Sequence, residues 1–153
     1  MQDILDSVTI TRDFIKLFLG KRLGGGMSRQ VYLCAQDHTA VIKIEAQSGR
    51  FQNVLEWEIW QTVKETKLKK YFAPCIAISD CGTVLIQKRA EPLRKEEYPK
   101  KIPAFFGDTK YQNFGKIGKQ FVCVDYGTTH IPALNKNLTN KLKKADFWNE
   151  SES

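Results

Sequence analysis

The apolar residues before position 90 repeat with the spacing of strands, then of a helix, then of strands again. Apolar residues at 14–19 have helical spacing behind the capping residue Thr11, which predicts a short amphipathic helix. The run LGGGMSRQVYLCAQDHTAVIKIE combines a glycine turn with short apolar segments around 31–33 and 41–44. This pattern predicts three strands in an antiparallel meander.

One longer amphipathic helix is predicted from Phe51 toward Leu68. The apolar residues that recur there at helical spacing are Val54, Leu55, Ile59 and Val63. After Pro74, the segments CIAIS and TVLIQKR are rich in β-branched residues and are separated by turn residues, which predicts a hairpin.

The rest of the chain is more polar. The segment EPLRKEEYPKKIPAF is charged and contains three prolines, so residues 91–103 are predicted to link two lobes. FVCVD predicts a short strand that ends in Asp125, and the lysine-rich segment NKNLTNKLKKADFW predicts a helix. Together these elements indicate an α+β fold.

Composition narrows the class of protein. A chain of 153 residues with 42% hydrophobic residues has the size and apolar content of one folded domain. Its net charge of +7 favours anionic partners such as nucleotides, nucleic acid or acidic proteins. Because no apolar stretch is long and uninterrupted enough for a signal or a membrane span, we expect a soluble, cytoplasmic protein.

The cysteines do not predict a metal site. Cys34, Cys75, Cys81 and Cys123 lack C-x-x-C spacing, and the sequence has only two histidines. We therefore expect reduced thiols rather than a zinc centre or disulfides.

A lysine on an apolar strand is the first candidate for chemistry. Lys43 lies in VIKIE, and because a buried ammonium is costly it needs an anionic partner. Two acids of the predicted helix, Glu56 and Glu58, are candidates. Helical spacing favours Glu56, which borders the buried stripe, whereas Glu58 is turned away from it.

Other candidate residues lie in loops. Gly24–Gly26 separate two predicted strands, where glycines allow a backbone to approach phosphate groups closely. The segment GDTKYQN contains Asp108 and Asn113, and Asp125 begins the DYG that ends a predicted strand. The stretch between Asn113 and Asp125 is long enough for a short hairpin.

The order of these motifs, from about residue 23 to residue 127, resembles that of the protein-kinase-like family. LGGGMSRQV resembles the glycine-rich loop, VIKIE the strand lysine, and TVLIQKR the hinge strand. GDTKYQN resembles the catalytic loop, with the pattern D-x-K-x-x-N, and VDYG resembles the metal-binding Asp-Phe-Gly. The resemblance implies an N-lobe with an antiparallel sheet and one helix.

The resemblance also implies roles for individual residues, with ATP and Mg²⁺ as cofactors. Asp108 would orient the acceptor hydroxyl and take its proton, and Lys110 would neutralise the transferred γ-phosphoryl group. Asn113 and Asp125 would be the magnesium ligands. The implied nucleotide-binding residues are Gly24, Gly25, Gly26, Ser28, Arg29, Val31, Lys43 and Glu56, of which Lys43 also counts as catalytic.

The sequence departs from the family pattern at several places. Arg29 stands where the third glycine of the loop is common, and Phe106-Gly107 replaces His-Arg before the catalytic Asp. This glycine is similar to that of small-molecule kinases related to aminoglycoside phosphotransferases. Few residues separate the hinge from Asp108, and no Ala-Pro-Glu segment follows, which implies a strongly reduced C-lobe. We expect one domain over 1–153, with an N-lobe over 1–90, a linker over 91–103 and a reduced C-lobe over 104–153.

Four functions follow from these patterns. The leading prediction is a Mg-ATP-dependent phosphotransferase acting on a protein Ser, Thr or Tyr hydroxyl. The alternatives are a pseudokinase that binds nucleotide or a partner protein without turnover, and a small-molecule phosphotransferase. A nucleic-acid-binding surface at Lys136, Lys141, Lys143 and Lys144 is not expected, because charge runs are usually solvated. A protein substrate or target is expected, and the small C-lobe favours either a homodimer or a partner that covers its exposed apolar faces.

Overall fold

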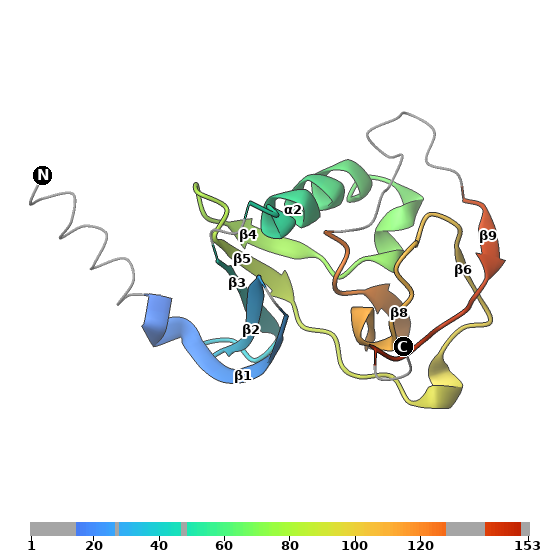
Figure 1. The fold of residues 1–153 in the computed structure, drawn as a ribbon, viewed down its shortest axis with the longest axis horizontal. Helices are drawn as coiled ribbons and strands as arrows, with labels where there is room; N and C mark the ends of the chain where they lie inside the picture. Colours follow the sequence, from blue (N-terminus) through green and yellow to red (C-terminus); the bar gives the residue numbers. More distant parts are fainter. Residues whose placement is uncertain (1–14, 27, 47–48, 128–139, 151–153) are drawn as a thin grey trace, which may run out of the picture.

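The computed structural model describes residues 15–26, 28–46, 49–127 and 140–150. Its N-terminal part is a five-stranded antiparallel sheet in the order β1-β2-β3-β5-β4 with one main helix, α2, beside it (Figure 1). The strands are β1 Leu19–Gly25, β2 Arg29–Cys34, β3 Ala40–Glu45, β4 Cys75–Ile78 and β5 Val84–Lys88. This architecture confirms the predicted α+β fold, with its meander and its hairpin.

The predicted N-terminal helix is confirmed in part. Residues 15–18 are helical, as their spacing predicted, whereas Leu19 already belongs to β1. Ala35 N donates a hydrogen bond to Phe18 O, so pairing with the end of β2 extends the strand to this point. Residues 1–14 lie outside the described part.

Helix α2 spans Gln52–Val63 and is followed by a 3₁₀ turn, η1, at Lys67–Tyr71. It begins after Phe51, whose left-handed backbone (φ 52°) turns the chain into the helix. The apolar pattern had predicted continuation toward Leu68. Thr66 ends it earlier, because its hydroxyl accepts from Leu68 N (3.1 Å) and starts the tighter turn.

The two faces of the sheet have different neighbours. Cys34, Ala40 and Ile42 are buried on one face, against Phe18 and Leu19. Lys43 lies on the other face, directly opposite Leu85 of β5, which belongs to the main hydrophobic core. Because side chains alternate along a strand, Lys43 and Glu45 lie together on this second face, beside α2.

The part after β5 consists of short strands and 3₁₀ turns, and its described residues contain no α-helix. A hairpin, β7 Phe114–Ile117 with β8 Gln120–Cys123, fills the stretch between Asn113 and Asp125, for which its length left room. A second pair joins β6 Lys101–Pro103 to β9 Leu142–Lys144. The 3₁₀ turns are η2 Lys95–Glu97 and η3 Tyr111–Asn113.

The prediction of a helix in the lysine-rich segment is wrong for its described residues. Residues 142–144 form β9, whose Lys143 pairs with Ile102 of β6. The following Phe147 packs against Tyr98, Tyr111 and Phe114 with ring centroids 4.9 to 5.5 Å apart. Cross-strand pairing and aromatic packing therefore outweigh the helical propensity of the lysines. Residues 128–139, including Lys136 of the expected basic surface, lie outside the described part.

A cluster of aromatic rings joins the part of the chain after β5 to the sheet and helix. Phe72 stacks on Phe105, with centroids 5.8 Å apart, and meets Phe106 and Tyr126 at 5.5 and 5.0 Å. All but Phe105 are fully buried. The segment that carries Asp125 is thus anchored by its neighbour Tyr126.

Within the ranges described, no helix has the length and apolar character needed to cross a membrane.

Candidate functional site

An ion pair between the sheet and α2 is the centre of the site. Lys43 Nζ on β3 lies 2.8 Å from Glu56 Oε2 on α2 and also donates to the backbone carbonyl of Val124. Both side chains are buried, whereas Glu58 is exposed. The structure thus confirms that Lys43 has an anionic partner and that this partner is Glu56, on the side of α2 that helical spacing favoured.

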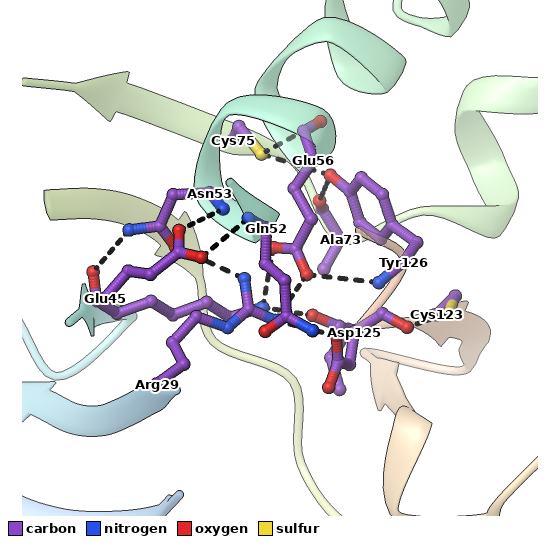
Figure 2. A network of polar contacts seen from close by, with 12 residues as sticks. Arg29, Glu45, Gln52, Asn53, Glu56, Ala73, Cys75, Cys123, Asp125 and Tyr126 are labelled. Carbon is purple, nitrogen blue, oxygen red and sulfur yellow. Dashed lines mark hydrogen bonds and ion pairs between the residues drawn. The ribbon is translucent and has the colours of Figure 1, made fainter. Parts of the chain in front are cut away.

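Arg29 brings a second buried cation to the same carboxylate. One terminal nitrogen of its guanidinium lies 2.7 Å from Glu56 Oε1 and 2.7 Å from Asp125 Oδ1, and the other donates to Asn53 Oδ1 at 3.2 Å. Figure 2 shows the guanidinium between α2 and the Asp125 segment. Arg29 therefore ties together β2, α2 and the strand end that carries Asp125.

The electrostatics of the cluster follow from burial and opposite charge. Burial by itself raises the pKa of Glu56, but Lys43 and Arg29 outweigh it and lower that pKa to about 2. Burial likewise opposes the charge of Arg29, and Glu56 with Asp125 raises its pKa above the ordinary value. Asp125 has a raised pKa because of its partial burial and the negative charge of Glu56. Glu56 and Arg29 therefore keep their charges over a wide pH range.

Two polar residues of this cluster were missed by sequence reasoning. Glu45 accepts hydrogen bonds from the first two backbone N–H groups of α2, at 2.7 Å from Gln52 N and 2.9 Å from Asn53 N. It thus replaces the side-chain cap that the helix lacks, and its charge suits the helix N-terminus. The fully buried Asn53 also donates to the backbone carbonyls of Lys43 and Thr83. The signal for Glu45 was its two-residue spacing from Lys43, which places both on one face.

The predicted catalytic loop lies against the predicted metal-binding segment. Asn113 Nδ2 donates to Asp108 O at 3.3 Å, and Asn113 O accepts from Val124 N at 2.8 Å. Lys110 Nζ lies 3.1 Å from Glu150 Oε1, and Glu150, followed by Asp108, raises the pKa of Lys110. The structure therefore brings the loop that contains Asp108, Lys110 and Asn113 next to Asp125, which follows β8.

The donor set near Asp125 suits magnesium in kind. Carboxylate and amide oxygens are its preferred protein ligands, and Asp125 and Asn113 supply one of each. Asn113 uses its amide nitrogen in the bond to Asp108, which leaves the amide oxygen as a potential ligand. Among the described residues, no group of three or more His, Cys, Asp and Glu forms a fuller metal site. One carboxylate oxygen of Asp125 already has a cationic partner, Arg29.

The predicted phosphate loop is only partly a loop. Gly24 and Gly25 belong to β1, where they pair with Val31 and Gln30, so the turn begins at Gly26 rather than spanning all three glycines. A Cβ added at Gly24 or Gly26 would meet no atom within 4 Å. Strand pairing of Gly24 and Gly25 explains why the loop is shorter than predicted. Gly24 and Gly26 still border open space.

Ser28 and Val31 lie at the edge of the cluster. The Ser28 hydroxyl donates to Gln52 Oε1 at 3.2 Å, at the start of α2. Val31 lies directly across the ladder from Lys43, and opposite residues of an antiparallel pair share a face of the sheet. Val31 therefore lies on the same face of the sheet as Lys43, and Ser28 lies at the start of α2.

Gly127 allows the Asp125 segment to approach α2. A Cβ at this position would lie 2.7 Å from the backbone oxygen of Gln52. We expect Gly127→Ala to lower the free energy of unfolding by about 1 to 3 kcal/mol, because backbone must move to relieve the overlap. Denaturant unfolding measures the change. Gly107→Ala is the matched control, since a Cβ there meets nothing within 4 Å; equal stability of the two variants would contradict the close approach.

No family model matches the sequence, and no curated protein matches it. Two solved structures are similar in fold. One is the streptomycin–ATP–APH(2″)-IIa ternary complex, with 20% sequence identity, a TM-score of 0.43 and coverage of 56% of this chain and 29% of that chain. The other is ADP-bound aminoglycoside phosphotransferase APH(2″)-Ib, with 17% identity, a TM-score of 0.42 and coverage of 60% and 34%.

The chain spans about a third of the length of these two proteins. At such low identity the likeness concerns the fold alone.

Proposed function

We propose that this chain is a Mg-ATP-dependent phosphotransferase of protein-kinase-like type that modifies a protein Ser, Thr or Tyr hydroxyl. The observation that carries the proposal is the convergence of Lys43, Glu56 and Asp125 from three separate elements. Asp108 and Asn113 lie beside Asp125, as the bonds to Asn113 require. The motif order that suggested the function therefore corresponds to one cluster in space.

Each residue has a distinct part in the proposed reaction. Lys43, held by Glu56, binds the α- and β-phosphates through its ammonium group. Asp108 orients the acceptor hydroxyl and accepts its proton, and Lys110 stabilises charge on the transferred phosphoryl group. Asp125 and Asn113 would hold magnesium, which would neutralise charge on the phosphates.

Lys43 provides a binding test of this assignment. We expect Lys43→Met to weaken ATP binding by about tenfold to a hundredfold, because a charge-assisted contact to phosphate is lost. The variant should stay folded, since Arg29 still pairs with Glu56. Isothermal titration of ATP in the presence of Mg²⁺ measures the loss. Lys88→Met, at an exposed position of the same sheet, is the control; equal ATP affinities of the two variants would refute the role of Lys43.

Transfer of labelled γ-phosphate tests the activity itself. Wild-type protein with Mg-ATP and cell lysate should label a protein, and Asp108→Asn should slow this by about 10² to 10⁴ because the proton acceptor is lost. The exposed Asp80→Asn is the charge-matched control. Labelling of a small molecule in place of protein would move the proposal to a small-molecule phosphotransferase, and equal labelling by Asp108→Asn would exclude Asp108 as the base.

A second candidate, a pseudokinase, is favoured by one specific observation. Lys110 is engaged by Glu150 at 3.1 Å and lies 5.1 Å from the centre of the Trp148 ring, so its charge is already partnered. A chain that binds nucleotide through Lys43, but whose Lys110 stays paired with Glu150 instead of the transferred phosphoryl group, would act by binding a partner protein. ATP binding without label on any protein or small molecule would support this candidate over the enzyme.

A further inference from the structure

Arg29, next to a glycine turn, is buried and has three polar side chains as partners. Its side chain is 6% exposed, and its guanidinium contacts Glu56, Asp125 and Asn53. Burying a guanidinium is costly unless its charge and its donors are all matched. Here two carboxylates from different segments match the charge, so the surroundings of Arg29 are built to hold its guanidinium.

Asp125 is the exposed member of this arrangement. Its side chain is 44% exposed, while Oδ1 is held by Arg29 at 2.7 Å. Asp125 therefore faces solvent on one side and a fixed positive charge on the other. Glu56 does not share this exposure, because it is fully buried and its two oxygens are divided between Lys43 and Arg29.

The charges of this cluster leave little net negative charge for a metal. Lys43 and Arg29 carry two positive charges, and Glu45, Glu56 and Asp125 carry three negative ones, a balance of about −1. A divalent cation that binds Asp125 must either take the oxygen from Arg29 or bind beside the guanidinium. Like charges oppose each other in both cases.

We propose that Arg29 is a resident counter-cation of Asp125 that competes with the divalent metal and so sets the metal concentration at which the site is loaded. The purpose of this competition rests on the proposed function, since metal loading accompanies nucleotide binding. The competition itself concerns only Arg29, Asp125 and the metal. It is therefore measurable without nucleotide.

The test is titration of purified full-length protein with Mn²⁺ alone, with free Mn²⁺ followed by electron paramagnetic resonance. We expect Arg29→Ala to bind Mn²⁺ about tenfold more tightly than wild type, because a competing charge-assisted contact is removed. Arg29→Lys should be intermediate, and Asp125→Asn added to Arg29→Ala should remove the gain. Arg22→Ala is the matched control, because Arg22 is exposed on the neighbouring strand and bonds only Gln30 among its described partners.

A measurement on wild-type protein covers the case in which Arg29→Ala does not fold. The Nε resonance of Arg29, in protein labelled with ¹⁵N-arginine and assigned with Arg29→Lys, should shift as Mg²⁺ is added. A resonance that stays fixed while Mg²⁺ binds would overturn the proposal. Unchanged or weaker Mn²⁺ binding by a folded Arg29→Ala would overturn it as well.

Failure of this proposal is distinguishable from failure of the proposed function. If ATP does not bind but Mn²⁺ affinity rises in Arg29→Ala, the competition stands and the nucleotide site does not. If ATP binds with Mg²⁺ and Arg29→Ala leaves Mn²⁺ affinity unchanged, the nucleotide site stands and the competition is refuted.

Discussion

Asp125→Asn is expected to reduce Mg²⁺-dependent ATP binding and phosphate transfer by about 100-fold or more, because the site loses a charged metal ligand. The substitution keeps the size of the side chain and leaves Tyr126 and Gly127 in place. Arg29 would still contact Glu56. The expected defect is therefore functional rather than a failure to fold.

The measurement compares ATP affinity with Mg²⁺ and with a chelator, together with thermal melting of each protein. Wild type should respond strongly to Mg²⁺, whereas Asp125→Asn should respond weakly and melt within a few degrees of wild type. Asp80→Asn, which removes an exposed carboxylate from the β4–β5 turn, should behave as wild type. A full Mg²⁺ response in Asp125→Asn would refute the metal assignment.

Glu56→Gln should cause the largest loss of stability, about 3 to 5 kcal/mol, because it leaves two buried cations without their shared carboxylate. Lys43 and Arg29 each lie within 2.8 Å of that carboxylate, and Tyr126 N donates to it at 3.1 Å. An amide carries no charge to offset the two cations. Denaturant unfolding near pH 7 measures the difference from wild type.

The same substitution predicts a pH dependence. The folded-state pKa of Glu56, about 2, lies below the ordinary value of about 4.3 for glutamate. Its contribution is therefore complete above about pH 4.3 and is lost as the pH falls toward 2. The stability gap between wild type and Glu56→Gln should narrow over that range. Glu58→Gln, two residues along on the exposed side, should show no gap; a gap independent of pH would contradict the charge-based explanation.

Local pattern was sufficient to predict much of the N-terminal part. The β-branched segments of β2 and β3 and the hairpin of β4 and β5 lie where alternation and turn residues placed them. The choice of Glu56 over Glu58 followed from helical spacing alone, because only one of them borders the buried stripe. These features depend on residues close together in the sequence, which is why a single sequence reveals them.

Features that depend on distant contacts were not predictable in this way. The strand β9 exists because β6 and an aromatic cluster around Phe147 hold it, and neither is visible in the lysine-rich segment itself. The bond from Arg29 to Asp125 joins residues 96 positions apart in the chain. From the sequence, Arg29 was expected only to replace the third glycine of the loop and to contact phosphate. Its place between two carboxylates required the fold.

Affinity labelling tests whether the cluster around Lys43 receives the phosphates of ATP. An ATP analogue with an acyl group on its γ-phosphate transfers that group to the amine of a nearby lysine, and peptide mass analysis identifies the modified residue. We expect modification of Lys43 or Lys110, with protection by excess Mg-ATP. Modification spread over exposed lysines, without protection by ATP, would contradict it.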